Sequence, residues 1–117
     1  MNAIKLFGIS NCDSVRRARR WLDGQGLDYR FHDLRKDGLA APRLAAWIAR
    51  TGWETLLNRR GTSWRQLPPE QRTGLDAQRA QTLMLAHPTL IKRPVLEVGE
   101  HLEVGFEADR YRALFEG

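Results

Sequence analysis

Short apolar runs alternate with a segment of helical periodicity in the first third of the chain. The run from Ile4 to Ile9 combines β-branched, aliphatic and aromatic residues, which predicts a strand that is buried on both faces. Apolar positions then recur along one helix face from Val15 to Asp23, and Gly24 and Gly26 end this helix. Residues 27–34 alternate in the manner of a second strand. The order β-α-β implies a parallel pair joined by a right-handed crossover.

The middle of the chain, from about residue 39 to residue 88, has a helical pattern that turn residues interrupt. Pro42 suits the first turn of a helix, and residues 53–57 predict a short helical turn. The prolines and glycine that follow predict irregular structure. Asp76 is a candidate N-cap for a further helix that ends at His87-Pro88.

The last segment returns to extended structure and then to a helix. Residues 90–96 are predicted to be extended. Gly99-Glu100 is a candidate turn between strands at Val95–Val98 and His101–Val104, and an apolar stripe near the C-terminal end predicts a final helix. The whole pattern predicts an α/β fold with a mixed four-stranded sheet, interrupted by an all-helical insertion because the strands on either side need one another.

Length and composition agree with a single domain. The chain has 117 residues, of which 42% are hydrophobic and 28% charged, which is too apolar for a disordered protein. We interpret residues 1–38 and 89–117 as one domain that carries an insertion at about residues 39–88. No run approaches the roughly 20 apolar residues of a membrane span, and the first residues do not resemble a signal peptide. The cytoplasm is therefore the expected location.

The charge is basic, with 19 Lys and Arg against 14 Asp and Glu, a net charge of +5. This excess predicts an anionic partner, either nucleic acid or a small anion. Four arginines cluster in the first helix: Arg16, Arg17, Arg19 and Arg20. A solvated helix face is the better interpretation of this cluster, because no aromatic residues interleave with it to stack bases. Nucleic-acid binding is not expected.

Cys12 is the single cysteine, which excludes an internal disulfide, a Cys-rich zinc site and an internal dithiol pair. It lies between a predicted strand and a predicted helix, where unpaired N–H groups and the helix dipole favour a thiolate. Cys12 is therefore a candidate nucleophile, although a lone cysteine is often a small buried apolar residue. Val15 stands at the second position of a C-x-x-C pair, so an outside thiol must resolve any disulfide of Cys12. The histidines show no metal-ligand spacing, and no metal is expected.

Two further basic positions are candidates for holding an anion. Arg93-Pro94 could form a cis bond and present a planar guanidinium to an oxyanion or a carboxylate, but the local sequence favours an edge-strand proline beside a surface arginine. Arg59 and Arg60 lie in a loop that ends at Gly61, where a solvated basic loop is the alternative.

Four segments cover nearly the full chain: FGISNCDSVRRARRWL, DYRFHDLRKDGL, GWETLLNRRGTSWRQL, and LMLAHPTLIKRPVLEVG with GF just after it. In this order they resemble the ArsC arsenate reductase family, and most closely its YffB-like subgroup. The resemblance implies a thioredoxin-like fold with an inserted helical subdomain.

The same resemblance implies the roles of individual residues. Cys12 matches the catalytic cysteine, and Arg93 matches the active-site arginine before a cis-proline, here Pro94. Arg60 falls at or near the second anion-binding arginine of the family. Asn11 and the first N–H groups of the helix would line the anion pocket. The chain departs from arsenate reductases after the last hairpin, where residues 104–106 (Val-Gly-Phe) replace a further arginine and weaken the fit to a doubly charged oxyanion.

The function implied by the resemblance is that of a glutathione-dependent thiol reductase. Cys12 would attack an arsenate-like oxyanion or a mixed disulfide, and glutathione, as reducing co-substrate, would resolve the adduct. Arg93 would hold the negative charge, with Arg60 assisting. No bound cofactor is expected, glutaredoxin is a possible further partner, and the chain is expected to be a monomer. The alternative is a non-enzymatic regulator of the Spx type that binds RNA polymerase or another protein, although such regulators typically have the C-x-x-C pair that this chain lacks.

Overall fold

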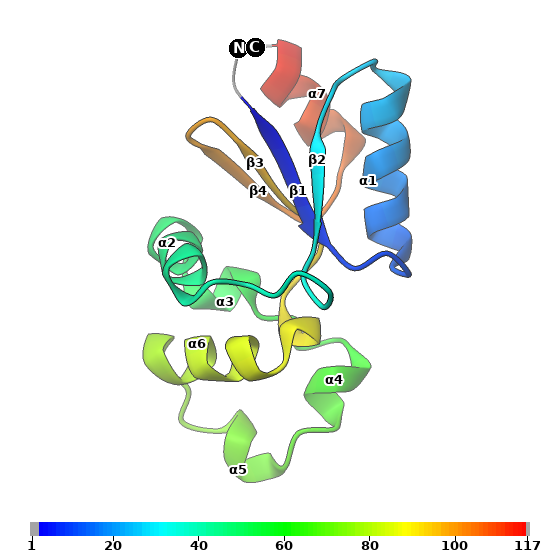
Figure 1. The fold of residues 1–117 in the computed structure, drawn as a ribbon. Helices are drawn as coiled ribbons and strands as arrows, with labels where there is room; N and C mark the ends of the chain where they lie inside the picture. The colour runs from blue at the N-terminus through cyan, green and yellow to red at the C-terminus, as the bar shows by residue number, and fades with distance from the viewer. Residues whose placement is uncertain (1–2, 117) are drawn as a thin grey trace. The chain divides into compact units, whose positions relative to one another are not determined.

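The computed structural model describes residues 3–116 (Figure 1). The chain begins with β1 (Ile4–Gly8), α1 (Asp13–Gly24) and β2 (Arg30–Asp33). The helical middle consists of α2 (Ala41–Thr51), α3 (Trp53–Leu56), α4 (Thr62–Arg65), α5 (Pro69–Arg72), α6 (Ala77–Ala86) and the 3-10 turn η1 (Pro88–Leu90). The chain then forms β3 (Val95–Val98), β4 (His101–Val104) and α7 (Ala108–Glu116). The predicted order of β-α-β, a helical stretch and then β-β-α is confirmed, including the hairpin turn between β3 and β4.

The four strands form one mixed sheet in the order β2-β1-β3-β4 (Figure 1). β1 runs parallel to β2, with Gly8 opposite Asp33, and antiparallel to β3, with Phe7 opposite Val95. β3 and β4 pair as an antiparallel hairpin. This register places the ends of β1, β2 and β4 and the beginning of β3 at the same end of the sheet.

The chain divides into two compact units. The sheet unit is formed by Met1–Asp37 and Arg93–Gly117, and the helical unit by Gly38–Lys92. The segment before β3 is less extended than its sequence predicts, because η1 replaces its first part. Ile91 then forms an isolated bridge with Leu57, and the Lys92 N–H donates to the Leu56 carbonyl at 2.8 Å. These contacts attach the segment to the helical unit.

The core of the sheet unit lies where α1 and α7 pack on the sheet. Leu6 and Leu96 of the sheet form one buried cluster with Leu22 of α1 and Tyr111 of α7. Trp21 joins this cluster by packing edge-on against Tyr111, with their ring centroids 5.7 Å apart. The predicted apolar faces of the first and last helices are therefore the faces that meet the sheet.

The helical unit has buried side chains of its own. Leu44 and Trp47 of α2 and Met84 of α6 are at most 1% exposed. Asp76 caps α6 by accepting a hydrogen bond from the Arg79 N–H at 2.8 Å, as its sequence predicts. The segment before α6, predicted to be irregular, instead contains α4 and α5. A proline in the first turn of α5 explains part of this difference, since that position needs no N–H donor.

Gly8 ends β1 where the strand packs directly on α1. A Cβ atom at this position would lie 2.6 Å from Cγ2 and 3.1 Å from Cγ1 of Val15. Val15 is fully buried in the first turns of α1, so it has no free space into which to retreat. The absence of a side chain at Gly8 therefore permits the close approach of strand and helix that fixes the loop between them.

Asp33 organises the turn that follows β2. Its Oδ1 accepts hydrogen bonds from the N–H groups of Arg35 at 2.8 Å and Lys36 at 3.0 Å. Burial of the carboxyl works to raise its pKa, but hydrogen bonds from the backbone of Lys36, Arg35 and Ser10 outweigh burial and hold the pKa of Asp33 below its ordinary value. Asp33 thus connects the turn after β2 with the loop after β1. The sequence analysis did not identify this role.

Substituting Gly8→Ala is expected to lower the free energy of unfolding by about 1–3 kcal/mol, because the added methyl group overlaps Val15. Urea unfolding followed by circular dichroism measures this loss. Gly24→Ala is the matched control, since a Cβ there meets no atom within 4 Å and alanine suits the end of a helix. Equal stability of the two variants would contradict the packing argument.

Substituting Asp33→Asn is expected to destabilise the chain in a pH-dependent manner. Because the folded state lowers the pKa of Asp33, the stabilisation is fully present above the unfolded pKa, near 3.9, and disappears as the pH falls through the folded pKa. The difference in unfolding free energy between the unaltered chain and the variant should therefore be constant near pH 7 and shrink below about pH 4. Urea titrations across this range test the sign, with Asp28→Asn as an exposed control. A difference that grows in acid would refute it.

Candidate functional site

The segments that carry the predicted catalytic residues meet at one end of the sheet. The loop with Asn11 and Cys12 follows β1, and Arg93-Pro94 directly precedes β3. Since Phe7 of β1 pairs with Val95 of β3 in antiparallel register, both segments leave the sheet at the same end. The sheet unit therefore holds four of the five predicted site residues in segments that its topology makes neighbours.

Cys12 is the N-cap residue of α1. Its backbone is extended, with φ −104° and ψ 128°, and its carbonyl accepts the N–H of Arg16 at 2.9 Å. Its own N–H donates to the Ile9 carbonyl at 3.2 Å, which closes the loop after β1. The half-buried Cys12 side chain makes no capping hydrogen bond, so the thiol leaves the first N–H groups of the helix to other acceptors. An anion bound beside Cys12 would meet the positive end of the helix dipole.

An ion pair occupies the first turn of α1. The Arg16 guanidinium donates to the Asp13 carboxylate, and both side chains are mostly exposed. This hydrogen bond from Arg16, with the charge of the same guanidinium, lowers the pKa of Asp13. Asp13 therefore stays ionised next to Cys12. The negative charge of Asp13 offsets the positive charge of Arg16, so this arginine contributes little net positive charge beside Cys12.

Arg93-Pro94 is a cis peptide bond, as the family resemblance implies. The local sequence favours an edge-strand proline, and this prediction is wrong. Pro94 is buried and directly precedes β3, which is an inner strand of the sheet. Pro94 has no N–H group to donate, but this disrupts no strand pairing because Pro94 lies before the first residue of β3. The Pro94 carbonyl accepts the N–H of Gly105 at 2.8 Å, which connects the start of β3 to the end of β4. Arg93 is half-buried in this segment.

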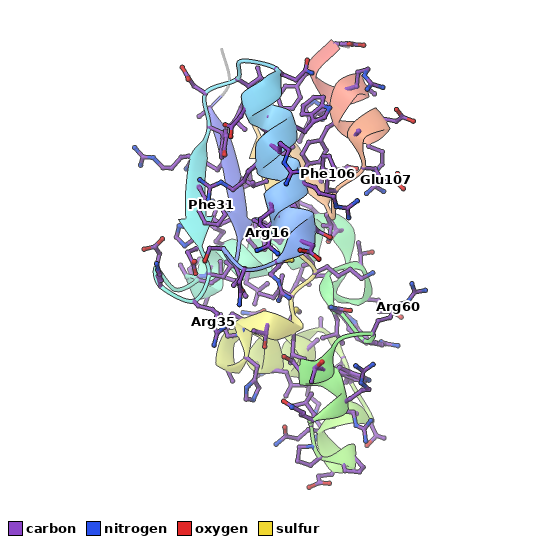
Figure 2. The ribbon with its side chains drawn as sticks, turned by 90° about the vertical axis from the view of Figure 1, so that its right-hand side faces the viewer. Arg16, Phe31, Arg35, Arg60, Phe106 and Glu107 are labelled. Carbon is purple, nitrogen blue, oxygen red and sulfur yellow. The ribbon has the colours of Figure 1, made fainter. Side chains whose placement is uncertain are left out.

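Phe106 is the last of residues 104–106, where the family resemblance implies a further arginine in arsenate reductases. Its ring packs edge-on against Tyr111 with centroids 4.8 Å apart, and the guanidinium of Arg17 lies 5.9 Å from its centroid. Arg17, Phe106, Glu107 and Asp109 line a shallow cavity of about 400 Å³ beside the start of α7. Figure 2 shows Phe106 and Glu107 near one another before this helix. This cavity is therefore lined by one aromatic ring and by side chains of both charges. The sequence alone gave no signal that Arg17 and Phe106 meet.

The arginines of α1 are not all solvated, which corrects the prediction for Arg19. This side chain is half-buried, and its guanidinium carbon lies 4.2 Å from the ring centroid of Phe31. Its Nε also donates to the Tyr29 hydroxyl at 3.0 Å. The alternating aromatic residues of the second strand segment supply these rings, and Figure 2 shows Phe31 on β2. Arg19 therefore belongs to the packing of α1 on the sheet.

Arg60, the fifth predicted site residue, belongs to the helical unit. Its N–H donates to the Asn58 side-chain oxygen at 3.0 Å, and its carbonyl accepts from the Arg65 guanidinium at 3.1 Å. The Arg60 side chain is exposed (Figure 2). Two hydrogen bonds therefore fix the backbone of Arg60. The role of its side chain in binding an anion stays a prediction.

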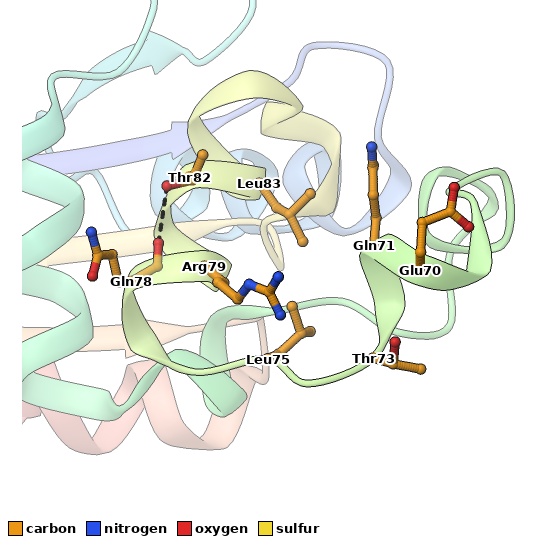
Figure 3. A pocket seen from close by; sticks show the side chains of 8 residues that line it. All are labelled: Glu70, Gln71, Thr73, Leu75, Gln78, Arg79, Thr82 and Leu83. Atoms are coloured by element: carbon orange, nitrogen blue, oxygen red, sulfur yellow. Dashed lines mark hydrogen bonds between the residues drawn. The ribbon is translucent and has the colours of Figure 1, made fainter.

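The helical unit has a cavity of its own, of about 320 Å³, between α5 and α6 (Figure 3). Leu75 and Leu83 give it an apolar part, and Arg79 donates to the Gly74 carbonyl at its rim. None of the predicted site residues lines it. Within residues 3–116, no group of three or more His, Cys, Asp or Glu is arranged to hold a metal ion, and no helix is long and apolar enough to cross a bilayer.

Several curated and solved proteins are similar to this chain over most of its length. A Haemophilus influenzae protein described as uncharacterized is 37% identical over 112 residues, which are 96% of this chain and 98% of that protein. Global transcriptional regulator Spx 1 of Lactococcus lactis is 26% identical over 112 residues, 94% of this chain and 87% of the regulator.

Solved structures extend the comparison to the fold. The YffB protein is 46% identical with a TM-score of 0.92, over 95% of this chain and 97% of its own. An arsenate reductase (ArsC) related protein of Brucella melitensis is also 46% identical, with a TM-score of 0.77 over 98% and 96% of the two chains. A glutaredoxin of Archaeoglobus fulgidus, 14% identical, matches all of this chain and 89% of its own with a TM-score of 0.50, which concerns the fold alone and agrees with the predicted thioredoxin-like class. Since the ArsC family model matches residues 7–114, the chain belongs to the ArsC family.

Proposed function

We propose that this ArsC-family chain is a single-cysteine thiol reductase that uses glutathione as its external reductant. The observation that carries the proposal is the position of Cys12, at the N-cap of α1 and at the same end of the sheet as Arg93 and cis-Pro94. A nucleophile there has free helix N–H groups beside it and an arginine on the neighbouring segment. These are the parts needed to bind an anionic group next to an attacking sulfur.

For a mixed disulfide, the Cys12 thiolate attacks one sulfur of the substrate. A new disulfide forms between Cys12 and that sulfur, and the other sulfur leaves as a thiolate. The thiolate of glutathione then attacks the new disulfide, which restores Cys12 and forms a disulfide that contains glutathione. Glutathione supplies the electrons, since this chain has no second cysteine to resolve the adduct.

An oxyanion such as arsenate would follow the same two stages. The Cys12 thiolate displaces a hydroxyl group of the oxyanion, which leaves as water after taking up a proton, and a sulfur–arsenic bond forms. A glutathione thiolate then attacks the Cys12 sulfur, which forms a Cys12–glutathione disulfide and releases the arsenic as arsenite, reduced by two electrons. A second glutathione thiolate resolves this disulfide, which restores Cys12 and releases oxidised glutathione. The similarity to the arsenate reductase (ArsC) related protein of Brucella melitensis supports this substrate class. The lack of an arginine in residues 104–106, where the resemblance implies one, favours a less highly charged substrate.

The remaining predicted residues have supporting roles in this proposal. Arg93 holds the negative charge of the substrate or a carboxylate of glutathione. Asn11 and the first N–H groups of α1 line the anion pocket, and Pro94 fixes the segment that carries Arg93. Arg60 assists at the anion. Glutaredoxin is proposed as a partner that reduces the glutathione mixed disulfide left after turnover.

The Cys12→Ser variant is expected to lose at least about 100-fold in turnover, because a serine hydroxyl cannot form or exchange a disulfide. The assay offers a glutathione mixed disulfide and arsenate in parallel, with glutathione as reductant, and measures thiol consumption. Ser14→Ala, near the same helix start, is the matched control and is expected to keep most of the activity. Equal rates for the unaltered chain and Cys12→Ser with both substrates would refute the proposal.

A second candidate function is that of a protein-binding regulator, which the similarity to Spx 1 of Lactococcus lactis favours. In this hypothesis the chain uses the exposed basic residues of α1 to contact RNA polymerase or another protein. Val15 stands where a C-x-x-C pair would have its second cysteine, so a dithiol switch within α1 is impossible. The regulator hypothesis therefore requires a redox-independent contact.

Reversing the charge of the exposed residues Arg17 and Arg20 to Glu tests this second function. Purified RNA polymerase is passed over the immobilised chain, and the regulator hypothesis expects retention that the double variant loses. Arg19 is left intact because its packing on Phe31 would confuse stability with binding. No retention of the unaltered chain, or undiminished retention of the variant, would exclude this basic face as the contact surface.

A further inference from the structure

We propose that Trp53, Arg59 and Trp64 form a docking site for an acidic segment of a partner protein. All three residues lie in the helical unit, on α3, on the loop that follows it, and on α4. We call this set the Trp-Arg-Trp site. It is separate from the thiol chemistry proposed for Cys12, and it does not depend on that proposal.

The guanidinium of Arg59 lies over both tryptophan rings. Its central carbon is 5.4 Å from the ring centroid of Trp53 and 5.8 Å from that of Trp64. Both distances are within the roughly 6 Å limit of cation–π interactions. Arg59 is exposed and the two tryptophans are half-buried, so the stack lies at the surface. These contacts favour one orientation of a long, exposed side chain.

The loop beneath Arg59 is fixed by its own hydrogen bonds. The Asn58 N–H donates to the Leu90 carbonyl at 2.7 Å, and the Asn58 side-chain oxygen accepts the N–H of Arg60 at 3.0 Å. Gly61 closes the loop so tightly that an added Cβ would lie 3.0 Å from the Asn58 side-chain nitrogen. Because the backbone is positioned and the two rings restrict the guanidinium before any ligand arrives, binding loses less conformational entropy than it would in a mobile loop.

The exposed edges of the Arg59 guanidinium fit a carboxylate. A guanidinium carries its N–H donors in one plane, as a fork that matches a carboxylate, and the exposed Arg59 leaves its donors open to such a contact. No carboxylate within residues 3–116 forms an ion pair with the side chain of Arg59, Arg60 or Arg65. Residues 53–66 contain these three arginines and a single acidic residue, Glu54. The surface around the site is therefore positive and chemically complementary to an acidic segment.

An acidic protein segment fits this site better than nucleic acid or a free anion. The faces of Trp53 and Trp64 that Arg59 covers are not open to stacked bases, on which single-stranded nucleic-acid binding depends. A segment with several carboxylates engages neighbouring arginines together, whereas a single free anion meets an exposed guanidinium in competition with water. Half-buried tryptophan beside arginine is also the composition of residues that dominate protein interfaces.

The test compares two charge-conserving substitutions in the same loop. Arg59→Lys keeps the positive charge but loses the planar stack, whereas Arg60→Lys alters an arginine for which no aromatic contact is found within residues 3–116. The probe is a fluorescein-labelled Glu-rich peptide, followed by fluorescence anisotropy, with a Gln-rich peptide of equal length as its control. Arg59→Lys is expected to weaken binding of the Glu-rich peptide roughly three- to tenfold, and Arg60→Lys by less than about twofold. Cys12→Ser is expected to bind as the unaltered chain does.

Other outcomes overturn the proposal. Equal binding by both lysine variants would mean that charge alone attracts the peptide and that the stack has no part. Binding of an oligothymidine more tightly than the Glu-rich peptide would assign the surface to nucleic acid. Full competition by inorganic phosphate at low millimolar concentration would assign it to a small anion. Thermal unfolding of each variant shows whether it is folded, and Arg59→Gln provides a second variant at the same position.

Discussion

Phe7 of β1 lies opposite Val95 of β3, and this antiparallel pair sets the end of one strand beside the beginning of the other. That register sets the positions of the loop with Cys12 and of the segment with Arg93, because each is attached directly to one of the paired strands. Gly8 adds the second constraint, since its missing side chain lets β1 end in contact with Val15 of α1. A bulkier residue would move the helix start, and with it the N–H groups beside the cysteine.

The arginines of this basic chain have different tasks, which net charge does not distinguish. Arg16 pairs with Asp13 in the first turn of α1, and Arg19 stacks on Phe31. Arg59 stacks on aromatic rings as well, but with its edges at the surface of the helical unit. The basic side chains behind the net charge of +5 thus include some in ion pairs, some in packing contacts and some available to an anion.

A single cysteine at a helix start has a clear chemical consequence. It can form one bond to an oxidised substrate, but it depends on a separate thiol to break that bond. Asp33, whose carboxylate is held ionised by backbone N–H groups including that of Ser10, stabilises the loop on which the cysteine is carried. The fold therefore contributes position and local electrostatics, and the reducing equivalents come from outside the chain.

The sequence by itself determined the order of elements, the hairpin turn at Gly99-Glu100, the cap at Asp76 and the place of Cys12 before the first helix. These features follow from signals between residues a few positions apart: periodicity, caps and turn residues. The tertiary structure decided the cis state of Arg93-Pro94, for which local sequence leaves both isomers accessible. It also decided the task of Asp33 and the partner of each arginine. Those depend on contacts between segments distant in the chain, which only the packed fold brings within reach of one another.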